Sequence, residues 1–357
     1  MIEIKHVNHL PKEFVQLCHE NEHYTIHQSL PFVNAYLKYF LGENHIFCLL
    51  AYDKGRLVSV LASEIKKTRF LKLFSYFEIQ ELGHSVNDFY NIPGDKRYSE
   101  EISTAFLNWF KNNSASWNRI NFSFIPSINE TGNLLTAKLA KEFDGKVYSE
   151  RNYFKIDTSI SWEEYFTAEI NKKLRDVRGR LNRIKRNGHE VKVEYINSGI
   201  LNYLPDFLIH FSKRRTDKQQ SNSYENFSKK QLIEYVVKNQ SDTCKVQLAL
   251  LKDEKDNIWA YQLDLLDTLK GIWYHYAPVF NDKYYEFSPG KVLLFLTLQD
   301  AFANKNILEF NFMRGESSYK QQFTDSSEKY LHCRVVNDKT WKYKLNRMLL
   351  NLKNLFN

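Results

Sequence analysis

The amino-acid sequence predicts an α/β protein made of two domains of similar build. The chain has 357 residues, which suits two domains, and 43% of them are apolar, enough to fill a core in each. The order strand, strand, strand, helix, strand also occurs twice, roughly 200 residues apart. Because this repeat shows in the order of elements and not in sequence identity, we interpret it as a diverged duplication.

The first repeat opens with two apolar runs, 46–52 and 57–65, which are rich in β-branched residues. The turn formers Asp53, Lys54 and Gly55 separate them, so the pattern predicts a hairpin. The remaining predicted elements are a third strand at 71–77, a helix from Glu101 to Lys111 and a strand from Ile120 to Phe124.

The second repeat has the same order. Runs 246–251 and 258–266 flank a turn from Lys252 to Asn257. The remaining predicted elements are a third strand at 272–277, a helix from Lys291 to Ala303 and a strand from Ile307 to Phe312. The helix is apolar nearly all round, which predicts burial between layers. In the last strand Leu308, Phe310 and Phe312 alternate with polar residues and are expected to share one face.

Two basic segments stand out. From Asn171 to Asn187 the chain carries eight basic residues and one acidic residue, with a helix-like pattern that Gly188 ends. This run is either a solvated helix face or a contact for a phosphate-rich ligand or tRNA. Residues 341–357 predict an amphipathic basic helix, which either docks on its own domain or lies on a membrane surface.

Charge and composition limit the partners. The formal net charge is +8, which favours anionic partners such as coenzyme A, nucleotide sugars, tRNA or an acidic membrane surface. The first 14 residues lack an apolar signal region, and no run of 18 apolar residues occurs, so a cytoplasmic protein is expected. The cysteines, Cys18, Cys48, Cys244 and Cys333, lie far apart, which predicts reduced core thiols and no metal site.

The turn Ser288-Pro289-Gly290 opens the apolar helix between two predicted strands. A helix N-terminus with a glycine beside it has free N–H groups and a positive dipole end, which can hold a phosphate. This order predicts binding of a phosphate-bearing acyl carrier, and hence an acyltransferase. We expect Ser288, Gly290, Lys291 and Arg314 to bind that cofactor-like donor.

The segment from Ser288 to Phe323 resembles the C-terminal signature of GNAT-superfamily acyltransferases of the CelD/BcsL type from cellulose biosynthesis. The matching motif is Ser-Pro-Gly, an apolar helix, a strand, and then Gly-acid-x-x-Tyr-Lys, here Gly315, Glu316, Tyr319 and Lys320. The resemblance implies tandem GNAT-like domains, each a mixed sheet flanked by helices, a fold shared with Fem-type aminoacyl transferases. We expect domains at 1–155 and 156–340, followed by the basic helix.

The resemblance also implies a function. An acyl group, such as acetyl, would move from acyl-CoA to an amine of an amino sugar or another cell-surface polysaccharide precursor. The enzyme would work in the cytoplasm, with peripheral contact to the inner face of the membrane, and without metal or DNA. The usual GNAT pyrophosphate loop is absent, and only Gly290 stands where it would end. A Fem-type transferase that uses aminoacyl-tRNA on a peptidoglycan precursor, or a non-enzymatic binding module, therefore stays open.

Attack by an amine requires a group that takes up its proton. Asp264, inside the apolar run YQLDLL, and His275, between two tyrosines on the next strand, are the candidates for this base. A buried carboxylate is costly without a partner, so Asp264 is either functional or part of a structural salt bridge. His275 is either the base or a hydrogen-bonded core residue.

Other candidates lie near the ends of predicted elements. Tyr319 could protonate the leaving thiolate and Lys320 could hold a phosphate or carboxylate, because α/β domains bind ligands beyond strand ends. Asp88 and Tyr90, in the polar loop HSVNDFYNIPG, are candidates for acceptor binding or for a turn. The segment from His210 to Arg215 resembles the middle region of the family, so His210 and Arg214 are expected to contact substrate.

Overall fold

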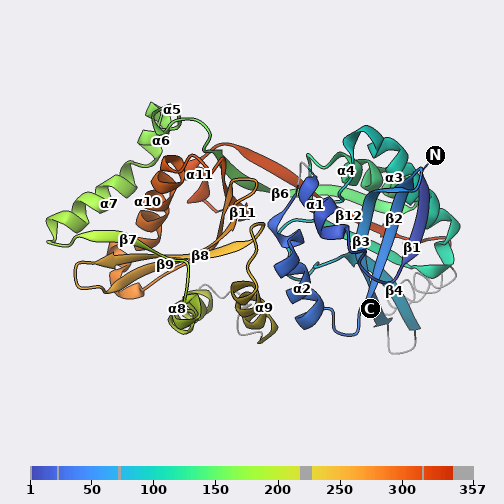
Figure 1. Cartoon of the computed structure of the whole chain (residues 1–357), viewed down its shortest axis with the longest axis horizontal. Coiled ribbons are helices and arrows are strands. Elements are labelled where there is room, and N and C mark those ends of the chain that lie inside the picture. Colours follow the sequence, from blue (N-terminus) through green and yellow to red (C-terminus); the bar gives the residue numbers. More distant parts are fainter. Residues whose placement is uncertain (1, 22–23, 71–73, 218–226, 316, 341–357) are drawn as a thin grey trace, which may run out of the picture. The chain divides into compact units, whose positions relative to one another are not determined.

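The computed structural model describes residues 2–21, 24–70, 74–217, 227–315 and 317–340. The chain forms two compact units (Figure 1). Unit 1 comprises Met1–Ser29, Tyr36–Arg151 and the chain from Glu328 onward, and unit 2 comprises Leu30–Ala35 and Asn152–Ser327. This division differs from the expected boundary after residue 155, because the last strand returns to unit 1. The predicted helix at 341–357 lies outside the described residues.

Unit 1 is built on a mixed sheet with the strand order β1-β2-β3-β4-β5-β12. β4 and β5 are parallel, and the other neighbours are antiparallel. Its strands are β1 (Glu3–Val7), β2 (His45–Asp53), β3 (Arg56–Phe70), β4 (Phe74–Glu81), β5 (Arg119–Pro126) and β12 (Ser327–Val336). Its helices are α1 (Phe14–Glu20), η1 (Ile26–Gln28), α2 (Leu30–Tyr39), η2 (Lys96–Tyr98), α3 (Ser99–Asn112), η3 (Ser114–Ser116) and α4 (Glu130–Glu142).

Unit 2 has the strand order β6-β11-β10-β9-β8-β7, and again one pair, β10 and β11, is parallel. Its strands are β6 (Asp144–Asp157, which starts in unit 1), β7 (Val191–Ile196), β8 (Lys245–Asp253), β9 (Ile258–Asp267), β10 (Ile272–Phe280) and β11 (Glu309–Arg314). Its helices are α5 (Trp162–Tyr165), α6 (Ala168–Lys173), α7 (Arg175–Arg186), η4 (Ile200–Asn202), α8 (Leu204–Asp217), α9 (Phe227–Lys238), η5 (Asp282–Phe287), α10 (Pro289–Ala303) and α11 (Lys320–Phe323).

The core of unit 2 confirms the predicted burial of the apolar helix. α10 lies on one face of the sheet, with α8 and α9 on the other (Figure 1). Leu294 and Leu298 pack between Trp273 of the sheet and Val177 of α7, and all four side chains are almost fully buried. An all-apolar helix is stable there because it has apolar neighbours on both sides.

The predicted basic helix and the predicted strand face need correction. The run at 171–187 forms two helices, α6 and α7, because the chain bends at Leu174, whose side chain is fully buried. In the last strand of unit 2, Phe310 and Phe312 are buried as expected, but Leu308 precedes β11 and is 50% exposed.

In both units the two parallel strands pair over a short stretch and then separate. β4 and β5 pair only from Glu78 to Gln80, and β10 and β11 pair only from Ile272 to Tyr274. Shortly beyond, β5 and β11 each contain a residue in the left-handed region, Phe124 with φ 60° and Met313 with φ 59°. The two strands of each pair therefore separate after three paired residues, and in unit 2 β10 continues to Phe280 without β11 beside it.

Candidate active site

A cavity of about 520 Å³ lies in unit 2 where β10 leaves β11 and where α10 begins. Its lining comes from α7, β10, η5, α10 and the residue before α11, so residues far apart in sequence lie together. The lining residues are Arg180, His275, Pro278, Phe280, Asp282, Tyr285, Glu286, Ser288, Gly290, Lys291, Leu294 and Tyr319. Five of the predicted site residues are thus gathered in one cavity, namely His275, Ser288, Gly290, Lys291 and Tyr319.

The N-terminus of α10 forms one wall of this cavity. Ser288 is the N-cap in the left-handed conformation (φ 52°, ψ 52°), and its side chain makes no capping hydrogen bond. The N–H groups of Lys291 and Val292 donate to the Ser288 carbonyl, whereas the Gly290 N–H has no hydrogen bond to any residue that the structure describes. This free N–H and the positive end of the helix dipole favour an anion at the cavity wall.

Charged side chains around this wall are partly neutralised by neighbours. The Lys291 ammonium lies 3.8 Å from Asp176, and the Arg180 guanidinium donates to the Glu286 carbonyl at 2.6 Å. The Glu286 carboxylate pairs with Arg183 of α7. Because cations and carboxylates alternate at this edge, the helix end and Lys291 are the places where a ligand phosphate would be favoured most.

His275 and Asp264 form a buried pair behind the cavity. The register of β9 and β10 places them opposite each other, and His275 Nδ1 lies 3.6 Å from Asp264 Oδ1. The His275 side chain is 1% exposed and lines the cavity, and its Nε2 has no hydrogen-bond partner. An unsatisfied buried nitrogen at a cavity wall is suited to a ligand proton.

Asp264 is held by a second buried partner. Gln262 Nε2 donates to Asp264 Oδ2 at 2.8 Å and lies 3.1 Å from Thr297 Oγ1 of α10. Burial raises the pKa of Asp264, and the neighbouring His275 opposes that rise. At 3.6 Å, neither Asp264 Oδ1 nor His275 Nδ1 has a hydrogen bond to a residue that the structure describes, so the carboxylate acts through its charge, which would stabilise a positive charge on the imidazole.

Tyr319 and Lys320 occupy different environments. Tyr319 is half-buried, lines the cavity, and has its ring centroid 6.4 Å from that of His275. Lys320 is 4% exposed, and its ammonium donates to the carbonyls of Met313 and Arg314. The expected contact of Lys320 with a phosphate is therefore corrected, because its ammonium ties the end of β11 to α11. Arg314 lies at that strand end and does not line the cavity.

Asp88, Tyr90 and His210, which were predicted to bind the acceptor, do not line this cavity. Tyr90 is buried in unit 1, where its hydroxyl donates to the Ala62 carbonyl at 2.7 Å, so its expected contact with substrate is corrected. Asp88 is half-buried in the same loop. His210 and Arg214 lie on α8, where the His210 ring packs 5.8 Å from the ring of Tyr261, and His210 does not line the cavity.

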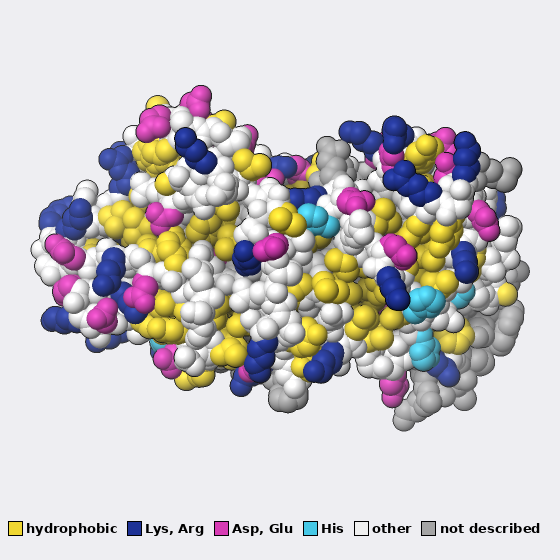
Figure 2. Space-filling model, viewed as in Figure 1, with side chains coloured by type: hydrophobic (Ala, Val, Ile, Leu, Met, Phe, Trp, Pro, Cys, Tyr) yellow, Lys and Arg dark blue, Asp and Glu magenta, His cyan; other side chains and the backbone are white. Residues whose placement is uncertain are grey.

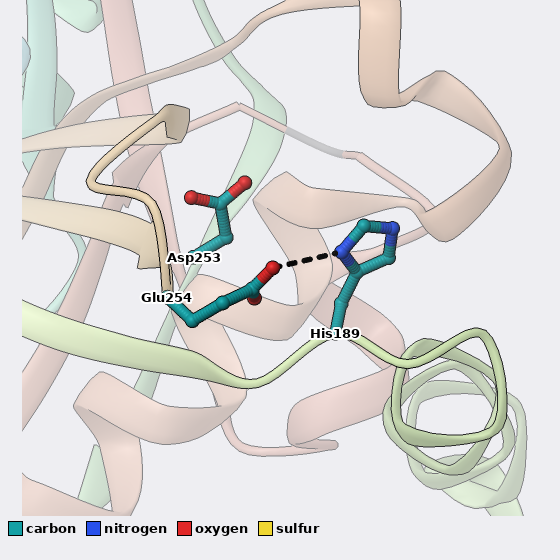
Figure 3. Close-up of side chains that lie close together, drawn as sticks. All are labelled: His189, Asp253 and Glu254. Atoms are coloured by element: carbon teal, nitrogen blue, oxygen red, sulfur yellow. Dashed lines mark ion pairs between the residues drawn. The ribbon is translucent and has the colours of Figure 1, made fainter.

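A second cluster of possible ligand atoms lies at the end of β8. His189, Asp253 and Glu254 each place one such atom within 4.8 Å of the others (Figure 3). The oxygens of Asp253 already accept hydrogen bonds, from the N–H groups of Lys255 and Asn257, from the Asn257 amide and from the Trp259 indole. The Asp253 carboxylate thus fixes the turn between β8 and β9, and the geometry offers no open set of metal ligands.

Sequence reasoning missed several lining residues. Arg180 belongs to the basic run, but the run alone could not show which of its cations turns toward α10. Asp282, Tyr285 and Glu286 lie in η5, between β10 and α10. Their position between a predicted strand and the Ser-Pro-Gly turn was the available signal.

Comparisons with known proteins agree with this architecture. Residues 171–321 match the family model described as "Acetyltransferase (GNAT) domain". FemX superposes with a TM-score of 0.61 at 10% identity, over 96% of this chain and 99% of that chain. L-PGS from Bacillus licheniformis gives 0.53 at 13% identity, over 94% of each chain.

A tandem GNAT protein from the clavulanic acid biosynthesis pathway gives a TM-score of 0.50 at 9% identity, over 94% of this chain and 99% of that chain. No curated protein matches the chain in sequence. At such identities the structural likeness shows the fold, and it confirms the predicted tandem GNAT-like architecture. The assignment to the CelD/BcsL type stays a prediction.

Proposed function

We propose that this GNAT-type transferase moves an acyl group, acetyl in the simplest case, from acyl-CoA to an amine of an amino sugar or a cell-surface polysaccharide precursor. The observation that carries the proposal is a single cavity that joins the free N-terminus of α10 to the buried His275–Asp264 pair. An anion subsite beside a proton acceptor is what transfer from a phosphate-bearing donor to an amine requires.

In this proposal the donor's pyrophosphate lies at Gly290 and Lys291. The acyl-bearing arm enters between β10 and β11, where the facing backbone groups beyond Tyr274 and Asn311 do not pair with each other. A strand edge that its neighbour has left can hydrogen-bond an extended ligand. On β11 the Met313 N–H donates to Asn311 and the Met313 and Arg314 carbonyls accept from Lys320, so this contact would fall to β10. The acyl carbon then lies near His275.

The transfer is a direct displacement at the acyl carbon. The amine nitrogen forms the new C–N bond, its proton passes to His275 Nε2, and the C–S bond of the thioester breaks. Asp264 stabilises the imidazolium that forms. Tyr319, on the cavity wall, gives its proton to the leaving thiolate.

Two substitutions at Gly290 test the donor subsite. A Cβ at this position would meet only Phe280, at 3.4 Å, so Gly290→Ala is expected to bind acyl-CoA almost as the wild type does. The larger side chain of Gly290→Val would block approach to the free N–H, and acetyl-CoA affinity should fall at least tenfold in calorimetry. Unchanged affinity in a folded Gly290→Val protein would refute the subsite.

His275→Ala separates chemistry from binding. Loss of a proton acceptor should lower kcat about 100- to 10,000-fold while acetyl-CoA affinity is kept. Asp264→Asn is also expected to lower kcat, by a smaller factor. Near wild-type turnover in His275→Ala would assign the base to another residue.

One observation favours a second candidate donor, aminoacyl-tRNA, with a peptidoglycan precursor as acceptor. α7 borders the cavity through Arg180 and buries Val177 and Ile184 on its inner side. The outer side of α7 carries exposed cations that form no ion pair with any residue that the structure describes, namely Arg175, Lys185 and Arg186, and the same holds for Lys172 of α6. Figure 2 shows Lys and Arg side chains gathered over α7, at the left of the view. Such a row suits a chain of phosphates.

The proposed place of action is the cytoplasm, with peripheral contact to the inner face of the membrane. Among the helices of the described residues, none combines the length and the apolar character needed to cross a bilayer. Anionic lipid would attract a chain with a net charge of +8, and a lipid-linked acceptor would be found at that surface.

A further inference from the structure

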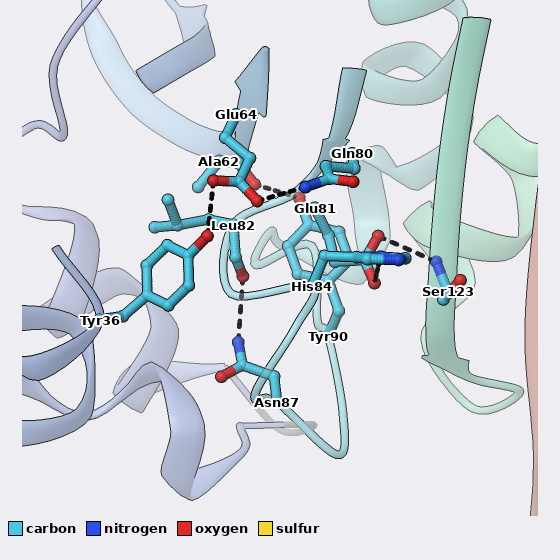
Figure 4. A network of polar contacts seen from close by, with 10 residues as sticks. All are labelled: Tyr36, Ala62, Glu64, Gln80, Glu81, Leu82, His84, Asn87, Tyr90 and Ser123. Atoms are coloured by element: carbon cyan, nitrogen blue, oxygen red, sulfur yellow. Dashed lines mark hydrogen bonds and ion pairs between the residues drawn. The ribbon is translucent and has the colours of Figure 1, made fainter. Parts of the chain in front are cut away.

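Unit 1 contains an imidazole–carboxylate pair of its own, formed by His84 and Glu81 (Figure 4). Glu81 ends β4 and is 1% exposed. Its Oε1 lies 2.8 Å from His84 Nδ1, and its Oε2 accepts a hydrogen bond from the Ser123 N–H at 3.0 Å. The His84 side chain is 27% exposed. A buried carboxylate therefore fixes one ring nitrogen, while the imidazole itself reaches solvent.

The pair lies where unit 2 has its own pair. In unit 1 the last residues joined in the parallel ladder are Gln80 and Asn121, and the next residue of β4 is Glu81. In unit 2 the last pair is Tyr274 and Asn311, and the next residue of β10 is His275. Each unit thus places an ionisable residue with an ionisable partner at the point where its parallel strands separate.

A purely structural role explains Glu64, the neighbouring carboxylate, better than it explains Glu81. Glu64 is 1% exposed and accepts hydrogen bonds from Tyr36 at 2.5 Å, from Asn44 at 3.2 Å and from Gln80 at 2.6 Å. These uncharged donors satisfy it inside unit 1. Glu81 instead directs one oxygen to a partly exposed imidazole, an arrangement that orients a base for a ligand.

The surroundings of His84 favour a positively charged ligand. The carboxylates that act on it come from two strands, Glu64 from β3 and both Glu78 and Glu81 from β4. One of these carboxylates, Glu78, has a cation beside it, because Arg119 of β5 lies 3.7 Å from it. The loop that follows β4 is tied to β5, because the Tyr90 N–H donates to the Phe124 carbonyl.

We propose that His84, oriented by Glu81, is a proton-accepting site on unit 1 that takes up a primary amine. The ammonium of the ligand gives its proton to His84 Nε2, so that an N–H bond breaks on the ligand and forms on the imidazole. The ligand leaves this step as the neutral amine, and the imidazolium faces the Glu81 carboxylate. The proposal rests on the proposed function in one respect, that this amine is the acyl acceptor.

The pH dependence has a definite sign. Burial lowers the pKa of His84, but the hydrogen bond and charge of Glu81 outweigh burial, so the net pKa lies above the usual value for histidine. His84 can accept a proton only when it is neutral, so uptake should increase as pH rises through that pKa. Glu81→Gln removes the charge, lowers the pKa of His84, and should move this rise to lower pH.

The first experiment measures binding without catalysis. In the full-length protein with ¹³C-labelled histidine, His84 is assigned by its loss in His84→Gln, and glucosamine is added as the probe. The His84 signal should shift with saturation in the wild type, and in Glu81→Gln the shift should begin at a lower pH than in the wild type. An unmoved His84 signal up to high glucosamine concentration would overturn the proposal, whether or not the protein transfers acyl groups.

The second experiment measures transfer from acetyl-CoA to glucosamine. His84→Gln should raise the acceptor KM or lower kcat at least tenfold and keep acetyl-CoA affinity. His45→Gln, at an exposed histidine of β2 in the same unit, is the matched control and should leave all three values unchanged. Full turnover in His84→Gln would refute the role of His84 in transfer, whereas absent acetyl-CoA binding in the wild type would refute the proposed function instead.

Discussion

At the residue scale, Ser288 combines an unfavourable backbone with an unused side chain. A left-handed conformation costs an L-residue other than glycine about 1–2 kcal/mol, and serine at an N-cap usually offsets such a cost by capping the helix. Ser288 makes no capping bond, and it lines the cavity. The left-handed turn lets the Ser288 N–H donate to the Tyr285 carbonyl at the end of η5, so the backbone has its own bonds and we expect the uncapped hydroxyl to serve a ligand.

Replacement of Ser288 should therefore separate stability from binding. Ser288→Gly removes the strain and is expected to raise the free energy of unfolding by about 1 kcal/mol. Acetyl-CoA affinity should fall about two- to tenfold, the value of one lost hydrogen bond. Denaturant titration and calorimetry measure the two effects.

Asp256→Gly is the matched control, because Asp256 is also left-handed, with φ 58°, but lies in an exposed turn. It should gain stability and keep affinity. If Ser288→Gly also keeps full affinity, the hydroxyl has no contact with the donor.

At the element scale, α7 has two faces with separate roles. Val177 and Ile184 fix its inner face in the core, and Arg180 reaches the cavity. On its outer face, Gly179 has no atom within 4 Å of a Cβ position, although glycine inside a helix costs about 1 kcal/mol. A bare, cation-flanked helix face lets a phosphate chain approach closely, so this face distinguishes the two candidate donors.

Charge reversal on that face should decide between them. If the donor is acyl-CoA, Arg175→Glu with Arg186→Glu should change donor affinity less than threefold. If it is aminoacyl-tRNA, the double variant should weaken binding strongly and reduce the slope of log affinity against log salt by about 2. Lys305→Glu, at another exposed lysine of unit 2, is the control for net charge. If the protein binds RNA and neither the double variant nor Lys305→Glu changes that affinity, the cations of α7 do not bind the donor.

At the scale of the whole molecule, the chain does not divide at one point. β12 pairs with β5, and its Cys333 and Val335 are fully buried in the core of unit 1, so residues near the C-terminal end complete the first unit. A domain that starts the chain thus needs a strand from far downstream. The expected domain 156–340 instead contains β12, because a sequence pattern predicts a strand but does not show which strand it pairs with.

A buried charge in β12 should therefore damage unit 1. Val335→Asp is expected to cost more than about 3 kcal/mol, because it buries an unpaired carboxylate. Hydrogen exchange should show lost protection in α3, α4 and β5, with α10 and β8 unchanged. Arg334→Asp, one residue earlier and exposed, is the control and should cost less than about 1 kcal/mol. Lost protection in α10 instead would support the division expected from sequence.

The sequence alone determined the features that depend on neighbours along the chain. The hairpin turn at Asp53–Gly55, the all-apolar α10 and the turn at Ser288 each follow from periodicity or from turn chemistry within a few residues. The repeated order of elements followed from the same local patterns. These local signals were enough to predict the tandem α/β architecture and five of the twelve residues that line the cavity.

Tertiary structure decided what depends on strand register and on distant packing. The sequence named Asp264 and His275 separately, but only the register of β9 and β10 makes them a pair. From the sequence we expected the Lys320 ammonium to bind a phosphate or carboxylate, whereas in the structure it donates to two backbone carbonyls. A one-residue shift in register would turn each strand residue to the other face, and no local pattern fixes that shift across many intervening residues. The site is therefore specified by contacts that form only when the sheet is assembled.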